Sequence, residues 1–150
     1  MTADLKFNLN NIDLEIVEEL NKRPGIYRFR YEVPTLVRKK NRRDLYSRVF
    51  RVGQSENLLS RIRDYARGAS GNLVFNKLLV EEPENFRVHV WYEDVGELDC
   101  SEAEVIFRHV NRYSRLPRFN RRGEFNALCE CAFEEGDCPT PVQRKRWSQP

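Results

Sequence analysis

The sequence predicts a small α/β domain, an α+β layer arrangement in which a short sheet of three mostly antiparallel strands is flanked by helices. Two patterns lead to this prediction. Three segments alternate apolar and polar residues with the period of a strand, and four segments repeat apolar residues with the period of a helix. The 150 residues suffice for one such domain and are few for two.

The N-terminal half is expected to hold one helix and two strands. Apolar residues recur at helical spacing over 13–22, and Pro24 ends that helix. A strand follows at 26–33, where aromatic side chains at odd positions alternate with mostly charged ones at even positions. The polar stretch 38–43 indicates an exposed loop, and a second strand is expected at about 47–52.

The C-terminal half is expected to alternate helices with one more strand. Ser55 can cap a helix at about 56–67, and a shorter helix is plausible at 72–79. A third strand is expected at 86–95, followed by a last helix that ends before Pro117. The chain then divides into a helical lead-in at 1–23, a main domain at 24–126 and a poorly ordered tail at 127–150.

The composition excludes several classes of protein. Hydrophobic residues make up 40% and aromatic residues 11%, which is too rich for a disordered chain, and no run of roughly 18 apolar residues predicts a membrane span. The N-terminus lacks the features of a signal peptide, so a cytoplasmic location without a membrane partner is expected, with reduced cysteines. Cys129, Cys131 and Cys138 lack zinc-ribbon spacing, so no metal is expected there.

The net charge of +3 conceals a strong segregation of charge. Residues 38–67 hold 10 basic and 3 acidic side chains, and residues 108–122 hold 6 arginines and no acid. Between these blocks, residues 81–104 hold 9 acidic side chains and 1 arginine. Such blocks suggest a surface that binds a polyanion, although charge counts alone favour the simpler explanation, a solvated, salt-bridged surface.

Several short motifs follow one another along the predicted elements. Gly25-Ile26-Tyr27 opens the first strand, and Arg51-Val52-Gly53 closes the second. Arg61 lies eight residues beyond Gly53 on the next helix, Tyr65 follows four residues later, and Pro117-Arg-Phe-Asn120 ends the series. In this order and on these elements, the motifs resemble those of the GIY-YIG nuclease superfamily, over about 95 residues.

The resemblance implies a metal-dependent DNA endonuclease with a GIY-YIG-like fold. It implies that one Glu holds Mg²⁺ or Mn²⁺, that Arg61 contacts the scissile phosphate, and that Tyr27 belongs to the network around the attacking water. Tyr65 and Asn120 match further motif positions, although Asn120 could equally cap the chain where it leaves the helix. These residue types suit phosphodiester chemistry, because a hard cation needs few carboxylates and an arginine fork matches phosphate oxygens.

Two departures from the family pattern bear on activity. Arg51 stands where the second motif usually carries Tyr, which removes a hydroxyl and adds a cation. This replacement either weakens catalysis or makes Arg51 a catalytic-site residue that gives a second contact to phosphate. In addition, 23 residues separate Tyr27 from Arg51, an insertion relative to the usual pattern, and it contains a basic run. The alternatives are therefore a catalytically weak or inactive nucleic-acid-binding domain of the same fold, or, ranked last, an adaptor whose acidic block docks a basic protein.

Glu104 is the favoured metal ligand and Glu102 the alternative. Both start the last helix, where Asp99 with Glu102 and Ser101 with Glu104 each fit a capping box. With Asp99 as the cap, Glu102 is structural and Glu104 lies at the edge of the apolar stripe. Glu104 precedes Asn120 by 16 residues, which is closer to the family spacing than the 18 residues of Glu102. A surface ion pair with Arg108 is the simpler role for Glu104.

The residues expected to contact the DNA backbone are all basic. They are Arg38, Lys39, Lys40, Arg42 and Arg43 in the insertion, Arg63 beside Arg61, and Arg108, Arg112 and Arg115 near the end of the last helix.

Overall fold

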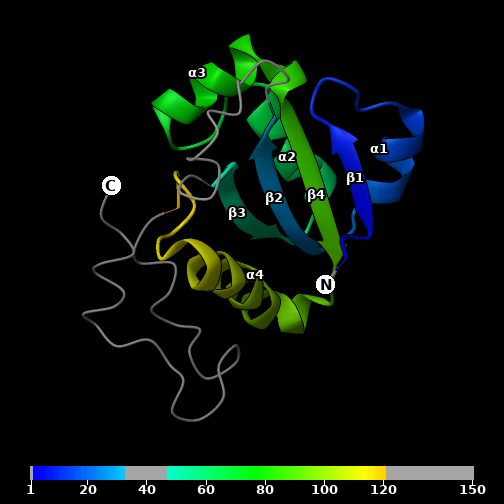
Figure 1. Ribbon diagram of the computed structural model, residues 1–150. Coiled ribbons are helices and arrows are strands. Elements are labelled where there is room, and N and C mark those ends of the chain that lie inside the picture. The colour runs from blue at the N-terminus through cyan, green and yellow to red at the C-terminus, as the bar shows by residue number, and fades with distance from the viewer. Residues whose placement is uncertain (1, 33–46, 121–150) are drawn as a thin grey trace.

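A computed structural model describes residues 2–32 and 47–120 as a four-stranded antiparallel sheet with helices on both faces (Figure 1). The strand order is β1-β4-β2-β3. The strands are β1 (Leu5–Asn8), β2 (Gly25–Tyr31), β3 (Val49–Ser55) and β4 (Phe86–Tyr92). The helices are α1 (Leu14–Leu20), α2 (Leu58–Ala66), α3 (Leu73–Glu81) and α4 (Leu98–Tyr113), with single 3₁₀ turns at η1 (Pro83–Asn85) and η2 (Val95–Glu97).

The mixed α+β class is confirmed, but the predicted count of three strands is wrong. The additional strand, β1, pairs with β4 in the register Leu5 to Val90 and Phe7 to Val88. It spans four residues, which is too short for alternation to stand out in the sequence. The first 20 residues thus contribute β1 and α1 to the same sheet and core as the later elements.

Alternation along the strands separates two apolar cores. Tyr27 and Phe29 of β2 point to the face covered by α1, α2 and α3, where Phe75 and Phe86 join the same core. Ile26 and Val52 point to the opposite face, where they pack with residues of α4 such as Ile106 and Val110. The face on which a side chain lies therefore follows from odd or even position in β2.

Side-chain caps set the starts of three helices. Asp13 accepts a hydrogen bond from the Ile16 amide (3.0 Å), Asn57 from the Ser60 amide and Asn72 from the Phe75 amide. Ser55, the expected cap of α2, is instead the last residue of β3, and its hydroxyl binds the Asn57 backbone. None of the helices in the described ranges has the length and apolar character needed to cross a membrane.

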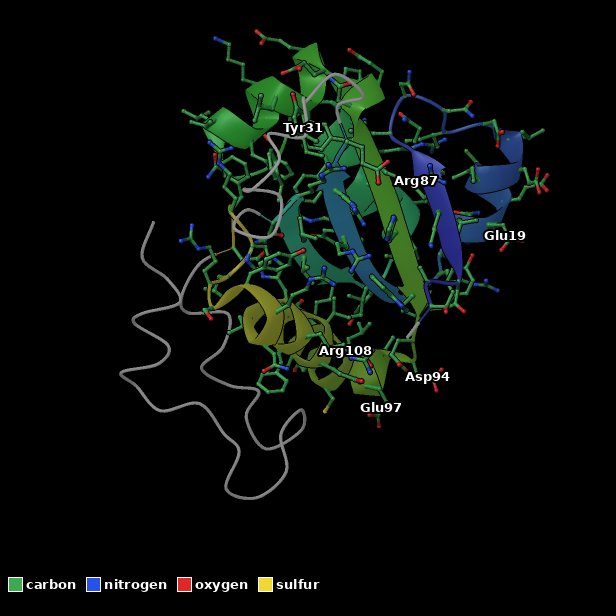
Figure 2. The ribbon with its side chains drawn as sticks, viewed as in Figure 1. Glu19, Tyr31, Arg87, Asp94, Glu97 and Arg108 are labelled. Atoms are coloured by element: carbon green, nitrogen blue, oxygen red, sulfur yellow. The ribbon has the colours of Figure 1, made fainter. Side chains whose placement is uncertain are left out.

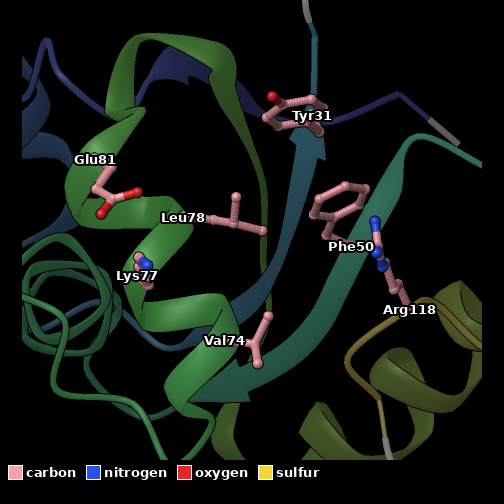
Figure 3. A pocket seen from close by; sticks show the side chains of 7 residues that line it. All are labelled: Tyr31, Phe50, Val74, Lys77, Leu78, Glu81 and Arg118. Carbon is pink, nitrogen blue, oxygen red and sulfur yellow. The ribbon is translucent and has the colours of Figure 1, made fainter.

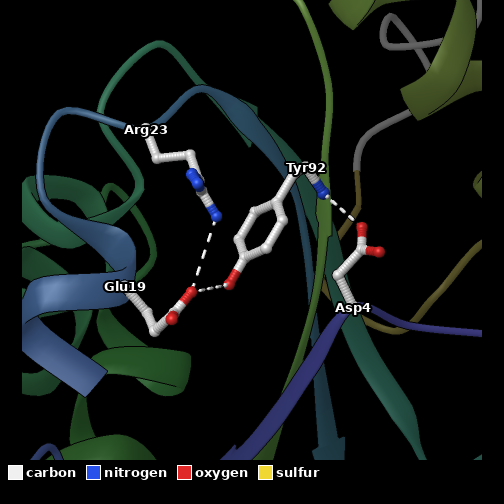
Figure 4. A network of polar contacts seen from close by, with 4 residues as sticks. All are labelled: Asp4, Glu19, Arg23 and Tyr92. Atoms are coloured by element: carbon white, nitrogen blue, oxygen red, sulfur yellow. Dashed lines mark hydrogen bonds and ion pairs between the residues drawn. The ribbon is translucent and has the colours of Figure 1, made fainter. Parts of the chain in front are cut away.

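A polar network holds β1 and α1 to the end of β4 (Figure 4). The Tyr92 hydroxyl donates to Glu19 of α1 (3.0 Å), and Glu19 also pairs with Arg23 (3.5 Å). The Tyr92 amide donates to Asp4 (2.8 Å), just before β1. The guanidinium of Arg23 lies 4.0 Å from the centre of the Tyr92 ring. These contacts fix the N-terminal elements against the central strands.

Candidate active site

Two tyrosines and one arginine from distant parts of the sequence meet on the sheet face that α2 covers. The hydroxyls of Tyr27 and Tyr65 lie 3.0 Å apart. Arg61 directs Nε toward the Tyr27 hydroxyl and a terminal nitrogen toward the Tyr65 hydroxyl, each at 3.5 Å. We call Tyr27, Arg61 and Tyr65 the tyrosine–arginine cluster. The structure therefore brings together three of the residues singled out in the sequence.

Gly53 makes room for the cluster. In the β2–β3 register Gly53 lies opposite Tyr27, and a Cβ atom at Gly53 would be 2.2 Å from the Tyr27 hydroxyl oxygen. Only a residue without a side chain lets the tyrosine ring extend across β3 toward α2. Arg61 and Tyr65 then project from one side of α2, because residues four apart share a helix face.

Burial dominates the electrostatics of Tyr27, which is 1% exposed. Burial raises the pKa of Tyr27 well above its ordinary value, the adjacent Tyr65 adds to the rise, and Arg51 and Arg61 oppose it. Among these protein groups, Tyr27 is therefore a neutral hydroxyl at pH 7. Because Tyr65 is also buried, half-buried Arg61 is the cluster member that solvent reaches.

Arg51 and Asn120 both lie along the outer edge of β3. Arg51 stands opposite Phe29 in the register and donates to the backbone carbonyl of Phe119 (3.3 Å). Asn120 makes two hydrogen bonds with Val52, accepting from its amide and donating to its carbonyl, each at 2.8 Å. The Asn120 side chain thus substitutes for a neighbouring strand at this edge.

The two candidate acids lie on different sides of α4. The helix begins at Leu98 with no side-chain cap, because Asp99 accepts a hydrogen bond from Gln54 (2.6 Å) and Ser101 donates to Glu93. Both predicted capping boxes are therefore wrong. Glu102, 7% exposed, lies with the buried residues of α4 that face the sheet.

Glu104 lies on the outer side of α4 and binds Arg108 (2.9 Å), with 44% of its side chain exposed. This is the helix-surface ion pair that the spacing allows. The hydrogen bond of Glu104 goes to Arg108 and not to the tyrosine–arginine cluster. The role of Glu104 as a metal ligand stays a prediction.

The four predicted DNA-contacting residues that the structure describes lie on two different sides of the sheet. Arg63 is exposed on α2, whereas Arg108, Arg112 and Arg115 are exposed on or just after α4, which packs on the other face of the sheet. The remaining five, Arg38, Lys39, Lys40, Arg42 and Arg43, lie outside the described residues, as do Cys129, Cys131 and Cys138.

A groove of about 410 Å³ opens between α3 and the ends of β2 and β3, at a distance from the cluster (Figure 3). Its aromatic wall is the stacked pair of Tyr31 and Phe50, whose ring centres are 5.0 Å apart. The lining residues are Tyr31, Phe50, Val74, Lys77, Leu78, Glu81 and Arg118. Tyr31 lies four residues beyond Tyr27, roughly 13 Å along the strand, so the groove is not part of the cluster.

One charged surface is not evident from the sequence. Lys6, Arg28, Arg30 and Arg87 all point to the same face of the sheet, on β1, β2 and β4. Each of these cations alternates with apolar residues along its strand, which indicates the face on which it lies. That they share one face could not be inferred, because strand β1 was not predicted and the strand order was unknown.

Comparison of the chain with protein-family models, curated proteins and solved structures returns no match.

Proposed function

We propose that the chain is a metal-dependent endonuclease that hydrolyses phosphodiester bonds in DNA, on a GIY-YIG-type domain. The observation that carries the proposal is the tyrosine–arginine cluster opposite Gly53. The motifs that resemble this family come from three separate parts of the sequence, and their side chains meet at one point on adjacent strands and a helix. If the short motifs matched the family only by chance, their side chains would not be expected to meet in the fold.

Arg61 is the residue best suited to contact the scissile phosphate. Its guanidinium is held by two buried hydroxyls and remains half exposed, so its other donors can reach a phosphate oxygen. Tyr27 and Tyr65 fix the orientation of this fork before substrate binds, which reduces the reorganisation needed during the reaction. Arg51, which lies close enough to affect the Tyr27 pKa, adds a second positive charge on this face.

The acids of α4 fit a magnesium site with one or two protein carboxylates. In the described ranges, no three His, Cys, Asp or Glu side chains gather at a point, and Mg²⁺ needs only one or two carboxylates because it keeps several waters. When bound, the ion supplies positive charge at the phosphate and acidifies a water. Of the two candidates, we favour Glu102, because it is buried on the side of α4 that faces the sheet, whereas Glu104 is exposed on the outer side of the helix.

The position of Glu102 along β3 supports this choice. Asp99, one helical turn earlier, binds Gln54, and Ile106, one turn later, packs with Val52. Glu102 therefore lies beside the stretch of β3 that contains Gly53. Because β3 is an edge strand, this stretch is where the α4 face and the cluster face of the sheet meet.

The test is cleavage of supercoiled plasmid and branched DNA by purified protein with Mg²⁺, Mn²⁺ or EDTA. We expect nicked or linear product only with a metal. Arg61→Lys should reduce the cleavage rate about 10²-fold, because an ammonium cannot reproduce the two-pronged contact. Arg63→Lys is the matched control on the same helix and should cleave at nearly the wild-type rate. Equal rates for these two variants would contradict the role of Arg61.

The second candidate is a DNA-binding domain of the same fold with little or no catalysis. Arg51 at the motif tyrosine position and the raised pKa of Tyr27 favour it. Binding of DNA by the wild-type protein without cleavage in any metal would support this candidate. Cleavage by Arg51→Tyr would then show that the missing tyrosine is the cause.

A further inference from the structure

Half of one sheet face has no helix over it in the described part of the chain. Helices α1, α2 and α3 pack on one face, and α4 packs on the other face against β3 and β2. In Figure 1, α2 lies behind the sheet, whereas β4 and β1 lie on the viewer's side. Trp91 near the end of β4 still packs with α4, but β1 and the earlier part of β4 extend past that helix. This surface lies on the side of the sheet opposite the tyrosine–arginine cluster, since it carries the other set of alternating side chains.

Four cations lie on or beside this surface, of which Lys6 and Arg87 are exposed and Arg28 and Arg30 are partly buried. In one cross-strand row, Lys6 of β1 and Arg28 of β2 flank His89 of β4. In the next row, Arg87 lies directly opposite Arg30. Figure 2 shows Arg87 on β4 and Arg108 on α4 in the same view. We call Lys6, Arg28, Arg30 and Arg87 the cationic sheet face.

The fold itself does little to neutralise these charges. Arg30 pairs with Glu32 (3.3 Å), but among the described residues no carboxylate pairs with Lys6, Arg28 or Arg87. Arg28 instead donates to neutral His89 (2.6 Å) and lies 5.0 Å from the centre of the Trp91 ring, while its buried Nε has no hydrogen-bond partner in those residues. Like charges opposite one another, as in Arg30 and Arg87, destabilise a sheet.

His89 reports the resulting positive potential. Burial and the charges of Arg28, Lys6, Arg30 and Arg87 lower the pKa of His89 to about 4. The protein thus keeps cations together at a cost in folding stability, and an external anion would relieve that cost.

We propose that the cationic sheet face is a second DNA-binding surface, which holds the phosphate backbone of a duplex segment other than the segment at the tyrosine–arginine cluster. The inference rests on the proposed function in taking DNA as the polyanion. A single phosphate would need donors that converge on a point, but these side chains spread over three strands, roughly 10 Å. Such an array suits a continuous backbone. The cationic sheet face and the tyrosine–arginine cluster lie on opposite faces of the sheet. A DNA in which two duplex arms meet could place one arm on each of them.

The experiment measures binding in EDTA, so that cleavage does not enter, with a fluorescent four-way DNA junction titrated by fluorescence anisotropy at several salt concentrations. Lys6→Gln combined with Arg87→Gln removes two exposed cations of the face. We expect the affinity to fall about 10-fold or more at low salt, and the slope of log K against log salt to become shallower by about 2.

Lys22→Gln combined with Lys77→Gln is the control, because both lysines are exposed, lie elsewhere and change the net charge equally. Its affinity should stay close to wild type. Equal affinity of the two double variants for the junction would overturn the inference. Arg87→Gln relieves repulsion with Arg30, so the thermal midpoint should not fall, which separates lost binding from lost folding. The endonuclease proposal fails on a different observation, the absence of cleavage by wild-type protein in Mg²⁺.

Discussion

At the scale of single residues, Gly53 decides whether the tyrosine–arginine cluster can form. The Tyr27 side chain crosses the position that a Gly53 side chain would occupy. Tyr27 itself is packed edge-on against Phe29 and Tyr65, with ring centres 5.7 and 5.4 Å away, so it has little room to move aside. The absence of a side chain at Gly53 of β3 thus allows Tyr27 to reach Tyr65 of α2.

We therefore expect Gly53→Ala to destabilise the protein by about 1 to 3 kcal/mol, the usual cost of overpacking a core. It should also displace the Tyr27 hydroxyl and weaken cleavage. Denaturant unfolding measures the first effect. Gly71→Ala is the control, since a Cβ atom there meets no other atom within 4 Å. A Gly53→Ala protein as stable as the Gly71→Ala protein would mean that the Tyr27 ring can relocate.

At the scale of elements, α4 presents two glutamates to different surroundings, and the proposed metal site uses only the buried one. Glu102→Gln should abolish metal-dependent cleavage by several orders of magnitude while DNA binding persists, because the charge that holds the ion is lost. Glu104→Gln should retain most of the activity, because it breaks only an exposed ion pair with Arg108 worth about 0.3 to 0.5 kcal/mol.

Cleavage by both variants is measured on the same plasmid and divided by the fraction of folded protein. If Glu104→Gln is the inactive variant, the choice between the two acids that we draw from burial is wrong and the choice drawn from sequence spacing is right.

The sequence predicted the elements of this fold better than their ends. The alternation in β2 and the apolar spacing in α2 and α4 each span two or more turns or pleats, so their types could be recognised. The start of α4 could not be recognised, because the side chains of Asp99 and Ser101 form hydrogen bonds with Gln54 and Glu93. Both partners lie outside α4. A capping pattern cannot reveal that its oxygens are engaged elsewhere.

The candidate site shows the same limit. Tyr27, Arg61 and Tyr65 were predictable because their motifs have fixed positions relative to Gly25, Gly53 and the helix. The cationic sheet face was not, because Lys6, Arg28 and Arg87 come together only once the order β1-β4-β2 is known. Cross-strand neighbours leave no trace in the spacing of a single sequence.

At the scale of the whole molecule, two buried histidines link folding to pH on the α4 side of the sheet. His109 donates from Nδ1 to the carbonyl of Arg115 (2.9 Å), and its Nε2 accepts from the Ser47 hydroxyl. It thereby ties α4 to the chain beyond its end and to the residues before β3. His89 accepts from Arg28 on the cationic sheet face. Both rings are neutral in these hydrogen bonds.

Because the folded protein resists protonation of His109, acid should destabilise it. Burial lowers the pKa of His109 to about 4, from an ordinary value of 6.5 in the unfolded chain. Between pH 6.5 and 4 the unfolded chain binds a proton that the folded protein does not, so the free energy of unfolding decreases as pH falls through this window and is unaffected by His109 above it. The loss approaches about 3 kcal/mol at pH 4. Urea unfolding of wild type and His109→Gln at a series of pH values measures this loss. The variant should be less stable than wild type above pH 7, and the difference in free energy of unfolding should narrow below pH 6. A difference independent of pH would show that His109 is protonated in the folded protein as readily as in the unfolded chain.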